Sequence, residues 1–295
     1  MNPYARSDLA CENVSEAELP SGVDWRRDRM GDFVISRLRI VTQKAAEQLG
    51  KPCGNYVTVE CGRLTSVSED AAEHLAYLLA EELREMATRL TGKAPDAEFS
   101  VFVAGLGNVE LTADAIGPKT VRLLTATRHL REHDGGLYHQ LGCSSLSALA
   151  PGVLGQTGIE TLELLRGAVR YVHPDVVLVI DALAARSCER LAATIQISDT
   201  GISPGSGVGN HRSAITKESL GVPVIALGVP TVVNSSTLVY DALEEAGIEE
   251  IDDSLRRVLE NGKSFFVSPK ESDVITHEAA KLFSRTIGLA FTAGF

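Results

Sequence analysis

Two aspartates, Asp114 and Asp181, follow short apolar runs that carry no charge. Small and polar residues lead from Ala104, the end of the first run, to Asp114, whereas the second run ends at Ile180, directly before Asp181. Two carboxylates held close together cannot both ionise easily, so the pKa of one rises. One can then take a proton from water while the other supplies one. Structural roles explain the pair equally well, because Asp114 can cap a helix and Asp181 can end a strand in a turn.

The two apolar runs are typical of central strands in a parallel sheet that is covered on both faces, since they are rich in β-branched residues. Strand and helix patterns alternate from Phe99 onward. This alternation predicts an α/β fold, a three-layer sandwich with a mostly parallel central sheet. Open sheets of this kind place their sites in loops at the carboxyl ends of the strands. We therefore expect both aspartates at one edge of the sheet.

The first part of the chain predicts fewer elements. Met1 to about Met30 is polar and irregular, which indicates an extended arm. Residues 32–42 and 55–62 have strand character. A helix is expected to begin near Ser66, which has capping-box spacing with an acidic residue, and to end at Gly92.

Glycine-rich stretches supply further candidates for the site. Residues 105–108 and 199–210 bend sharply and expose N–H groups that suit a phosphate, an oxyanion or a peptide backbone, although plain turns explain them as well. Arg186 suits a substrate carboxylate or a surface salt bridge. Residues 132–142 are predicted to be a loop or lid. The candidates for binding substrate or an oxyanion are Gly105, Asn108, Arg186, Gly205, Ser206 and Gly207.

Composition argues against several classes of protein. The 295 residues carry a formal net charge of -11, which disfavours nonspecific binding to nucleic acid or to anionic membranes. No apolar stretch approaches the roughly 20 residues of a membrane span, and the first residues lack the apolar core of a signal peptide, so we expect a cytoplasmic protein. The five scattered cysteines include no CxxC pair, and the seven histidines form no HExxH motif. His129 and His133 fit a solvated helix end better than a metal pair, and no metal or cofactor is indicated.

Together, these motifs resemble the germination proteases of spore-forming bacteria. The matching stretches, between Arg6 and Lys270, are RSDLACE, GLGN, DAIGP, TRHL, APGVLGQTGIET, VIDALAARS, TIQISDTGISPGSGVGN, LGVPVIALGVPTVV and FFVSPK. The resemblance implies an atypical aspartic endopeptidase whose fold is similar to the hydrogenase maturation proteases. It implies small acid-soluble, DNA-coating spore proteins as substrates, without direct contact to nucleic acid. It places the two catalytic aspartates at Asp114 and Asp181.

The resemblance also implies a zymogen that removes its own propeptide. Residues 1–8 would be the propeptide and residues 9–295 a single α/β peptidase domain, with cleavage at the Asp8–Leu9 bond. The sequence SDLACE around that bond is similar to the substrate motif of the family: an acid before the cut, then a large apolar residue, two small residues and an acid. The family further implies a homotetramer in the cytoplasm of the forespore, the later spore core.

Two departures from the family pattern stand out. The propeptide is shorter than is usual, and Asn234 follows the PTVV motif where the family typically has aspartate. Two other functions stay open at this point. One is a metal-dependent maturation protease of similar fold, and the other is a non-catalytic protein that binds phosphate or nucleotide.

Overall fold

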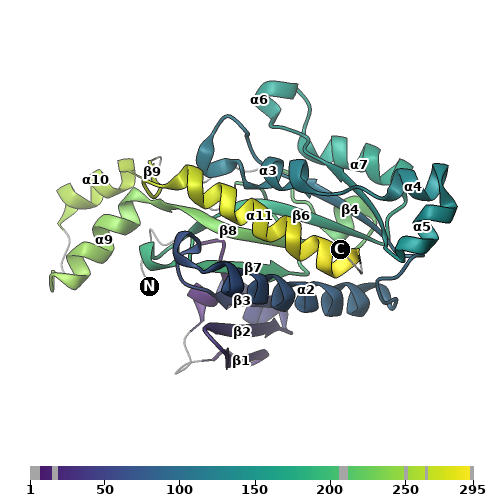
Figure 1. Cartoon of the computed structure of the whole chain (residues 1–295). Helices are drawn as coiled ribbons and strands as arrows, with labels where there is room; N and C mark the ends of the chain where they lie inside the picture. Colours follow the sequence, from purple (N-terminus) through teal and green to yellow (C-terminus); the bar gives the residue numbers. More distant parts are fainter. Residues whose placement is uncertain (1–6, 15–18, 206–211, 249–251, 263–264, 293–295) are drawn as a thin grey trace.

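The computed structural model describes residues 7–14, 19–205, 212–248, 252–262 and 265–292. Its strands form one mixed sheet (Figure 1). They are β1 Val23–Met30, β2 Phe33–Ile40, β3 Gly54–Glu60, β4 Ser100–Gly105, β5 Ser145–Leu149, β6 Val176–Ala185, β7 Thr194–Ser198, β8 Val224–Asn234 and β9 Phe266–Val267. Their order is β1-β2-β3-β7-β8-β6-β4-β5, and β9 pairs with β8.

The centre of the sheet is parallel, as predicted. Strands β8, β6, β4 and β5 run in the same direction, and β6 and β4 contain the two apolar runs that precede the aspartates. On the other side of β8 the sheet continues as the antiparallel strands β7, β3, β2 and β1. The sequence predicted β2 and β3 but not this extension of the sheet, because pairing between distant strands leaves no local pattern.

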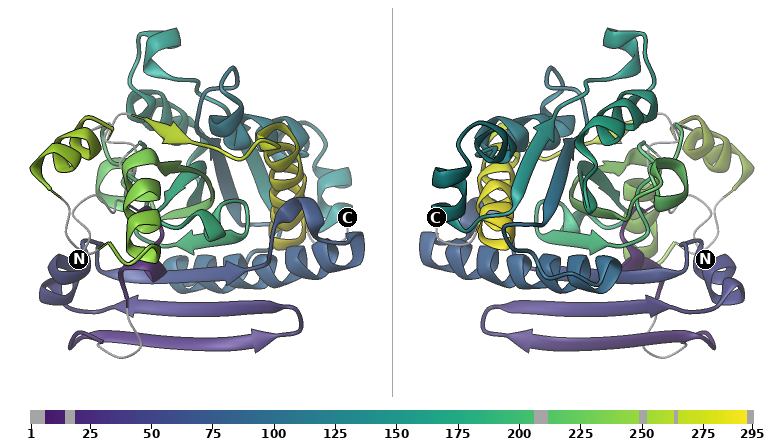
Figure 2. Two further views of the ribbon diagram at one scale, coloured as in Figure 1. Left: turned by 90° about the vertical axis from the view of Figure 1, so that its left-hand side faces the viewer. Right: turned by 90° about the vertical axis from the view of Figure 1, so that its right-hand side faces the viewer.

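Helices cover both faces of the sheet and make three layers (Figure 2). The helices are α1 Gln43–Leu49, α2 Glu69–Thr91, α3 Ile116–Leu123, α4 Arg128–His133, α5 Gly135–Leu141, α6 Leu154–Thr157, α7 Thr161–Val172, α8 Lys217–Leu220, α9 Ser235–Glu245, α10 Asp253–Gly262 and α11 Ser272–Phe291. Helices α2, α3 and α11 pack together on one face, where α2 and α11 lie side by side (Figure 1). Helices α7 and α8 pack on the other. Helices α9 and α10 stand away from the sheet (Figure 1).

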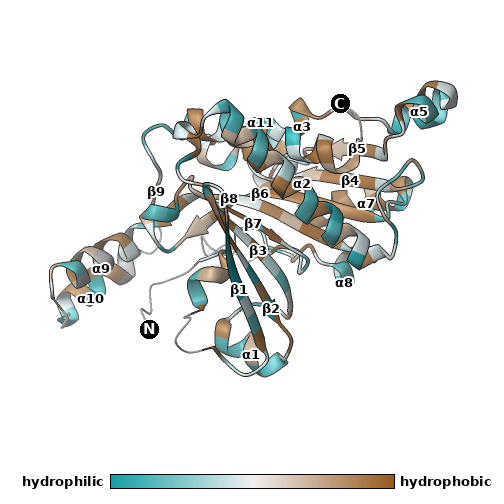
Figure 3. Ribbon diagram, turned by 60° about the horizontal axis from the view of Figure 1, so that its bottom comes forward, coloured by the Kyte–Doolittle hydropathy of each residue, from teal (hydrophilic) through white to brown (hydrophobic). Residues whose placement is uncertain are grey.

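Alternating side chains of β6 divide the core into two apolar layers. Leu178 and Ile180 are fully buried and belong to the layer under α2 and α11. Val177 and Val179 are equally buried and belong to the layer under α7. Figure 3 shows the apolar central strands between these layers, with β1 mostly hydrophilic at the end of the sheet. A strand that is buried on both faces explains why the sequence of β6 is uncharged instead of alternating.

The extended arm predicted for residues 1–30 is wrong for the part that the structure describes, residues 7–14 and 19–30. Residues 10–13 form a short 3-10 helix, η1 Ala10–Asn13, and β1 is a full strand that forms a hairpin with β2. Strand β1 is largely exposed, so its sequence lacks the apolar alternation by which a strand is found. Leu9 is fully buried. This burial comes from tertiary packing, which the polar and irregular sequence around Leu9 does not predict.

Two smaller predictions also need correction. The long helix α2 begins after Ser68, whose side chain accepts a hydrogen bond from the Ala71 N–H, so Ser66 is not the cap. Residues 132–142 are mostly helical instead of a loop, because α4 ends and α5 begins within them, around Asp134. The end of α2 at Gly92, which has a φ of 72°, is confirmed.

Among the helices of the described residues, none is long and apolar enough to cross a membrane.

Candidate functional site

Asp181 lies where β6 continues past the end of its neighbour β4. Ile180 pairs with Gly105, the last residue of β4, and the Leu106 N–H donates to the Ile180 carbonyl oxygen at 2.8 Å. Strand β6 runs on to Ala185, so Asp181 sits within a strand and is not a turn residue. Its side chain is only 5% exposed. The staggered ends of the two strands therefore place a buried carboxylate at the carboxyl edge of the parallel sheet.

Asp114 reaches the same edge through a tight loop after β4. The residue ends a short 3-10 helix, η3 Thr112–Asp114, and its Oδ2 accepts a hydrogen bond from the Asn108 N–H at 2.7 Å. Gly107 has a φ of +112°, and a Cβ there would lie 1.9 Å from the Asp114 carbonyl oxygen. Only glycine permits this approach. Asp114 is not the cap of α3, whose first turn begins after Ala115 without a side-chain cap.

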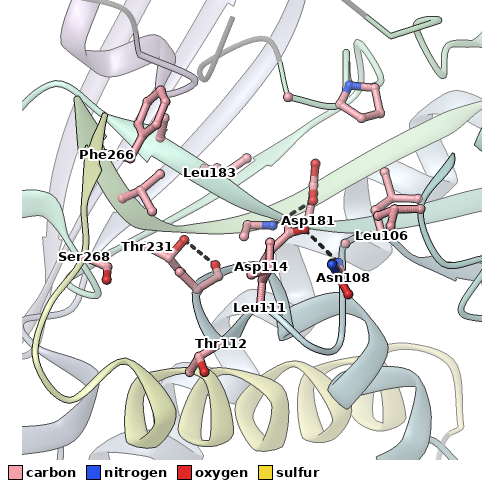
Figure 4. Close-up of a pocket in the computed structure, with 18 of the residues that line it drawn as sticks. Leu106, Asn108, Leu111, Thr112, Asp114, Asp181, Leu183, Thr231, Phe266 and Ser268 are labelled. Carbon is pink, nitrogen blue, oxygen red and sulfur yellow. Dashed lines mark hydrogen bonds between the residues drawn. The ribbon is translucent and has the colours of Figure 1, made fainter. Parts of the chain in front are cut away.

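The two aspartates line one cavity of about 970 Å³ (Figure 4). The cavity is bounded by the loop after β4, by β6 and β8, and by the N-terminal segment through Asp8. Thr231 of β8 donates from Oγ1 to the Ala113 carbonyl oxygen at 2.7 Å and so fixes the loop that carries Asp114 (Figure 4). The prediction that two strands deliver both aspartates to one edge of the sheet agrees with this geometry.

Burial and mutual charge set the protonation of the pair. Burial raises the pKa of Asp181 well above its ordinary value, and the carboxylates of Asp114 and Asp8 raise it further. Burial also raises the pKa of Asp114, but the Asn108 N–H and the Arg212 guanidinium act against that rise. Asp181 therefore holds a proton more tightly than Asp114 does.

The N-terminal segment Ser7–Asn13 docks beside the aspartates. Asp8 is bound to β6 at Ala184: the Asp8 N–H donates to the Ala184 carbonyl oxygen, and the Ala184 N–H donates to Asp8 Oδ2, each at 2.8 Å. Leu9 packs in a small apolar cluster with Leu183, Ala185, Leu191 and Val233. The segment thus has specific partners for both its backbone and its side chains.

A second carboxylate of the segment has its own binding site. Glu12 accepts hydrogen bonds from the N–H groups of Arg186 and Ser187, at 2.8 and 3.0 Å. The Arg190 guanidinium lies 3.5 Å from Glu12 Oε1, and the Ser7 hydroxyl also donates to the carboxylate. Bonds to an ionised acceptor are the stronger kind, so this site is well suited to the Glu12 carboxylate.

The predicted binding residues have different places. Asn108 and Gly205 line the cavity, whereas Gly105 lies beneath it, where a Cβ would come within 2.3 Å of the Gly117 carbonyl oxygen. Arg186 uses its backbone N–H, not its guanidinium, to bind the Glu12 carboxylate. Ser206 and Gly207 lie outside the described residues.

Asn234 ends β8 and is 6% exposed. Its side-chain oxygen accepts a hydrogen bond from the Ser236 N–H at 2.8 Å, at the start of α9. The structure thus gives this residue a role in ending a strand and starting a helix.

Sequence reasoning missed four polar residues around the segment and the cavity. They are Lys51, Arg190, Gln196 and Arg212. Gln196 lies between two isoleucines of β7 and is 7% exposed, but Thr194 and Ser198 alternate with those isoleucines in the same way, so the sequence did not single it out. The other three belong to loops or short turns whose sequences do not show what they face.

No group of three or more His, Cys, Asp or Glu side chains within the described ranges is placed to hold a metal ion. His129 and His133 both belong to α4. All five cysteines are free. Burial raises the pKa of Cys61 to about 12, so its thiol is a core residue and not a nucleophile.

Comparison with known proteins identifies the family. A family model described as germination protease matches residues 6–246. The germination protease of Caldanaerobacter subterraneus subsp. tengcongensis is 42% identical over 315 residues, which cover 98% of this chain and 94% of that protein. That of Priestia megaterium is 43% identical over 241 residues, 80% of this chain and 64% of that protein. Among solved structures, a hydrogenase maturation protease, HycI from Thermococcus kodakarensis KOD1, matches 65% of this chain and 93% of its own at 15% identity and a TM-score of 0.32.

The family model and the relatives matched by sequence define a peptidase. The chain belongs to the germination protease family, and it is a protease of spore germination. This membership decides against both alternative functions, the hydrogenase-type maturation protease and the non-catalytic phosphate- or nucleotide-binding protein.

Proposed function

We propose that the chain is an aspartic-type endopeptidase in which Asp114 and Asp181 activate a water molecule. The observation that carries this proposal is that both carboxylates line one cavity together with Asp8, and that the charge of Asp114 raises the pKa of Asp181. A pair in which one carboxyl keeps its proton and the other ionises can act as acid and base at once.

The unequal environments of the two carboxyls suggest their roles. Asp114 accepts a hydrogen bond from the Asn108 N–H and interacts electrostatically with the Arg212 guanidinium, and both favour its ionised form. It acts as the general base on water. Asp181 is more deeply buried and keeps its proton. It acts as the general acid that protonates the leaving nitrogen.

The same proposal includes a zymogen that cleaves its own Asp8–Leu9 bond and releases residues 1–8. Three contacts support it: Asp8 lines the cavity, Leu9 fills an apolar cluster, and Glu12 occupies a carboxylate site. The bound segment supplies an acid, a large apolar residue, two small residues and an acid in succession. Residues 9–295 then form the mature peptidase domain.

The substrates in this proposal are small acid-soluble spore proteins that present the same order of side chains. They would use the positions that the N-terminal segment fills, with the cut after an acid and before a large apolar residue. The protein would work as a homotetramer in the cytoplasm of the forespore and in the spore core, as the family resemblance implies.

Intact mass tests the proposal directly. Purified full-length protein at mildly acidic pH should lose residues 1–8, whereas Asp114→Asn and Asp181→Asn should keep their full mass. Asp24→Asn is the matched control, because Asp24 is exposed on β1 and the same amide replacement there should leave processing unchanged. Circular dichroism confirms that each variant is folded. Full processing by a folded Asp181→Asn protein would refute the catalytic assignment.

A further inference from the structure

The carbonyl oxygen of Asp8 is bound by two side chains that do not belong to the aspartate pair. Lys51 Nζ donates to it at 2.9 Å, and Gln196 Nε2 donates to it at 3.0 Å. Lys51 Nζ also donates to the carbonyl oxygen of Ser7 at 2.8 Å. This Asp8 carbonyl is the reacting group of the Asp8–Leu9 bond.

We propose that Lys51 and Gln196 bind the carbonyl oxygen of the residue before the scissile bond and stabilise the oxyanion that forms there during peptide hydrolysis. The inference rests on the proposed function, because it takes Asp8–Leu9 as the bond that is cut. It assigns the oxyanion to residues on the antiparallel side of the sheet, not to the glycine-rich loops.

Gln196 holds both sides of the bond. While its Nε2 donates to the Asp8 carbonyl oxygen, its Oε1 accepts a hydrogen bond from the Ala10 N–H at 2.7 Å. The backbone N–H can only donate, so it fixes which end of the carboxamide faces Asp8. The side chain is 7% exposed and therefore cannot turn freely into water. A donor that is oriented in advance is what stabilisation of an oxyanion requires.

The sheet places Gln196 and Asp181 in one row. Asp181 pairs with Gly228 of β8, and Gly228 pairs with Gln196 of β7, so the two side chains point to the same face. Two strand spacings separate their backbones, about 10 Å. Gly228, between them, has no side chain. The side chain of Leu183 lies over Gly228, with its Cγ 2.6 Å from where a Cβ would be. The row therefore places a carboxyl on one side of that leucine and an amide donor on the other.

Lys51 is suited to a developing negative charge. The residue is partly buried and follows Gly50, which ends α1. Burial lowers the pKa of its ammonium, while the carboxylates of Asp8 and Glu12 act in the opposite direction. A partly buried ammonium needs acceptors, and here they are two peptide carbonyls of the segment. Once residues 1–8 leave, the equivalent carbonyls of a substrate can replace them.

These groups account for each proton and electron pair that moves during hydrolysis of the Asp8–Leu9 bond. Water loses one proton to Asp114, its oxygen bonds to the Asp8 carbonyl carbon, and the π electron pair moves onto the carbonyl oxygen. Lys51 and Gln196 donate hydrogen bonds to that oxyanion. The electron pair then returns to re-form the carbonyl, the C–N bond breaks, and the Leu9 nitrogen takes the proton of Asp181. One water and one peptide bond give one carboxyl group and one amine. Proton exchange with water then removes the proton from Asp114 and restores that of Asp181.

The test uses two measurements. Intact mass gives the rate at which full-length protein loses residues 1–8. Hydrogen exchange at the Ala10 amide, in an Asp181→Asn background, reports whether the segment stays docked. Removal of one oxyanion donor lowers catalytic rates by about 100- to 1000-fold. Lys51→Met should slow processing by about that factor, while exchange at Ala10 should rise less than about tenfold. Lys51→Arg, which keeps charge and donors, should recover part of the rate.

Lys44→Met is the matched control, since Lys44 is exposed on α1 and loses the same charge. It should process at the rate of the unmodified chain. A Lys51→Met rate within about threefold of the unmodified chain would overturn the inference and leave the proposed function standing. So would a slower rate matched by an equal rise in exchange, because Lys51 would then only dock the segment. No processing of the unmodified chain would overturn both.

Gln196→Glu covers the case in which Lys51→Met does not fold. Glutamate keeps the acceptor for the Ala10 N–H but cannot donate to the Asp8 carbonyl oxygen when ionised. Processing should slow by about 100-fold or more, with Ala10 still protected from exchange. Normal processing by a folded Gln196→Glu protein would refute the role of the amide.

Discussion

Replacing Leu9 by alanine should release the N-terminal segment from its site without unfolding the rest of the protein. Leu9 is fully buried and packs with Leu183, Ala185, Leu191 and Val233. Leucine-to-alanine changes in protein cores cost about 2–5 kcal/mol, with the lower values where the site can collapse. The segment lies at the edge of the core, so we take about 2–3 kcal/mol. At about 1.36 kcal/mol for each factor of ten, this shifts the opening equilibrium of the segment by about 30- to 160-fold.

Hydrogen exchange measures that shift in the Asp114→Asn background, in which we expect no self-cleavage. The Ala10 amide, which donates to Gln196 Oε1, should exchange about 30- to 160-fold faster in Leu9→Ala. The Arg186 and Ser187 amides should accelerate by a similar factor, because both donate to Glu12 of the same segment. Coordinated change at positions so far apart in sequence is the signature of one docked unit opening.

Leu19→Ala is the matched control, since Leu19 is 43% exposed and the change removes the same atoms. It should leave all three amides unchanged. Unchanged exchange at Ala10 in Leu9→Ala would refute the reasoning, because it would mean that the apolar contact does not hold the segment. Faster exchange throughout the sheet would also refute it, since the loss would then be one of global stability.

Three further predictions concern the charges and the loop around the site. Asp181→Asn should unfold at a higher temperature than the unmodified chain at neutral pH, but at the same temperature below about pH 4. The pKa of Asp181 is raised in the folded protein, so the stability that its proton contributes is lost as pH rises from the unfolded pKa through the folded pKa, at about 1.4 kcal/mol per pKa unit. Equal melting temperatures of the two proteins at both pH values would contradict this. Glu12→Gln should speed exchange of the two amides bound to that carboxylate by about 10- to 160-fold, because hydrogen bonds to charged groups contribute about 1.5–3 kcal/mol. Unchanged exchange would show that the charge does not strengthen these bonds. Gly107→Ala should slow self-processing by about 100-fold or more, because its Cβ would lie 1.9 Å from the backbone oxygen of Asp114. Gly155→Ala is the control and should process normally, since there is open space around that position. Equal rates for the two variants would contradict the requirement for glycine at position 107.

The docked segment and the aspartate pair are electrostatically linked. The Asp8 carboxylate raises the pKa of Asp181, so release of residues 1–8 removes one of the charges that keep Asp181 protonated. The pKa of Asp181 should therefore be lower in the processed protein than in the full chain. Its carboxyl group, labelled with carbon-13 and titrated by NMR in both forms, gives the comparison, and an equal or higher pKa after processing would show that the Asp8 charge does not reach Asp181.

Local sequence determined the parallel centre of the fold and the aspartate pair. Uncharged, β-branched runs before Asp114 and Asp181 are typical of strands buried on both faces, and the carboxyl ends of parallel strands meet at one edge. The glycines of the loop after β4 also carried a local signal, since Gly107 occupies a backbone conformation that other residues rarely adopt. In each case the physical cause acts between residues that are close in the sequence, so a short stretch of sequence is enough to predict it.

Tertiary structure alone decided what surrounds the pair. Gln196 and Asp8 are separated by 188 residues, and Lys51 and Asp8 by 43, yet all three meet at one carbonyl group. Their meeting depends on the antiparallel strands that extend the sheet beyond β8 and on the burial of Leu9, both of which come from packing between distant segments. Hydrophobic burial is non-directional and can be satisfied by many partners. The sequence therefore showed which residues are able to do chemistry at the parallel edge, while the three-dimensional packing decided which polar groups face the bond beside them.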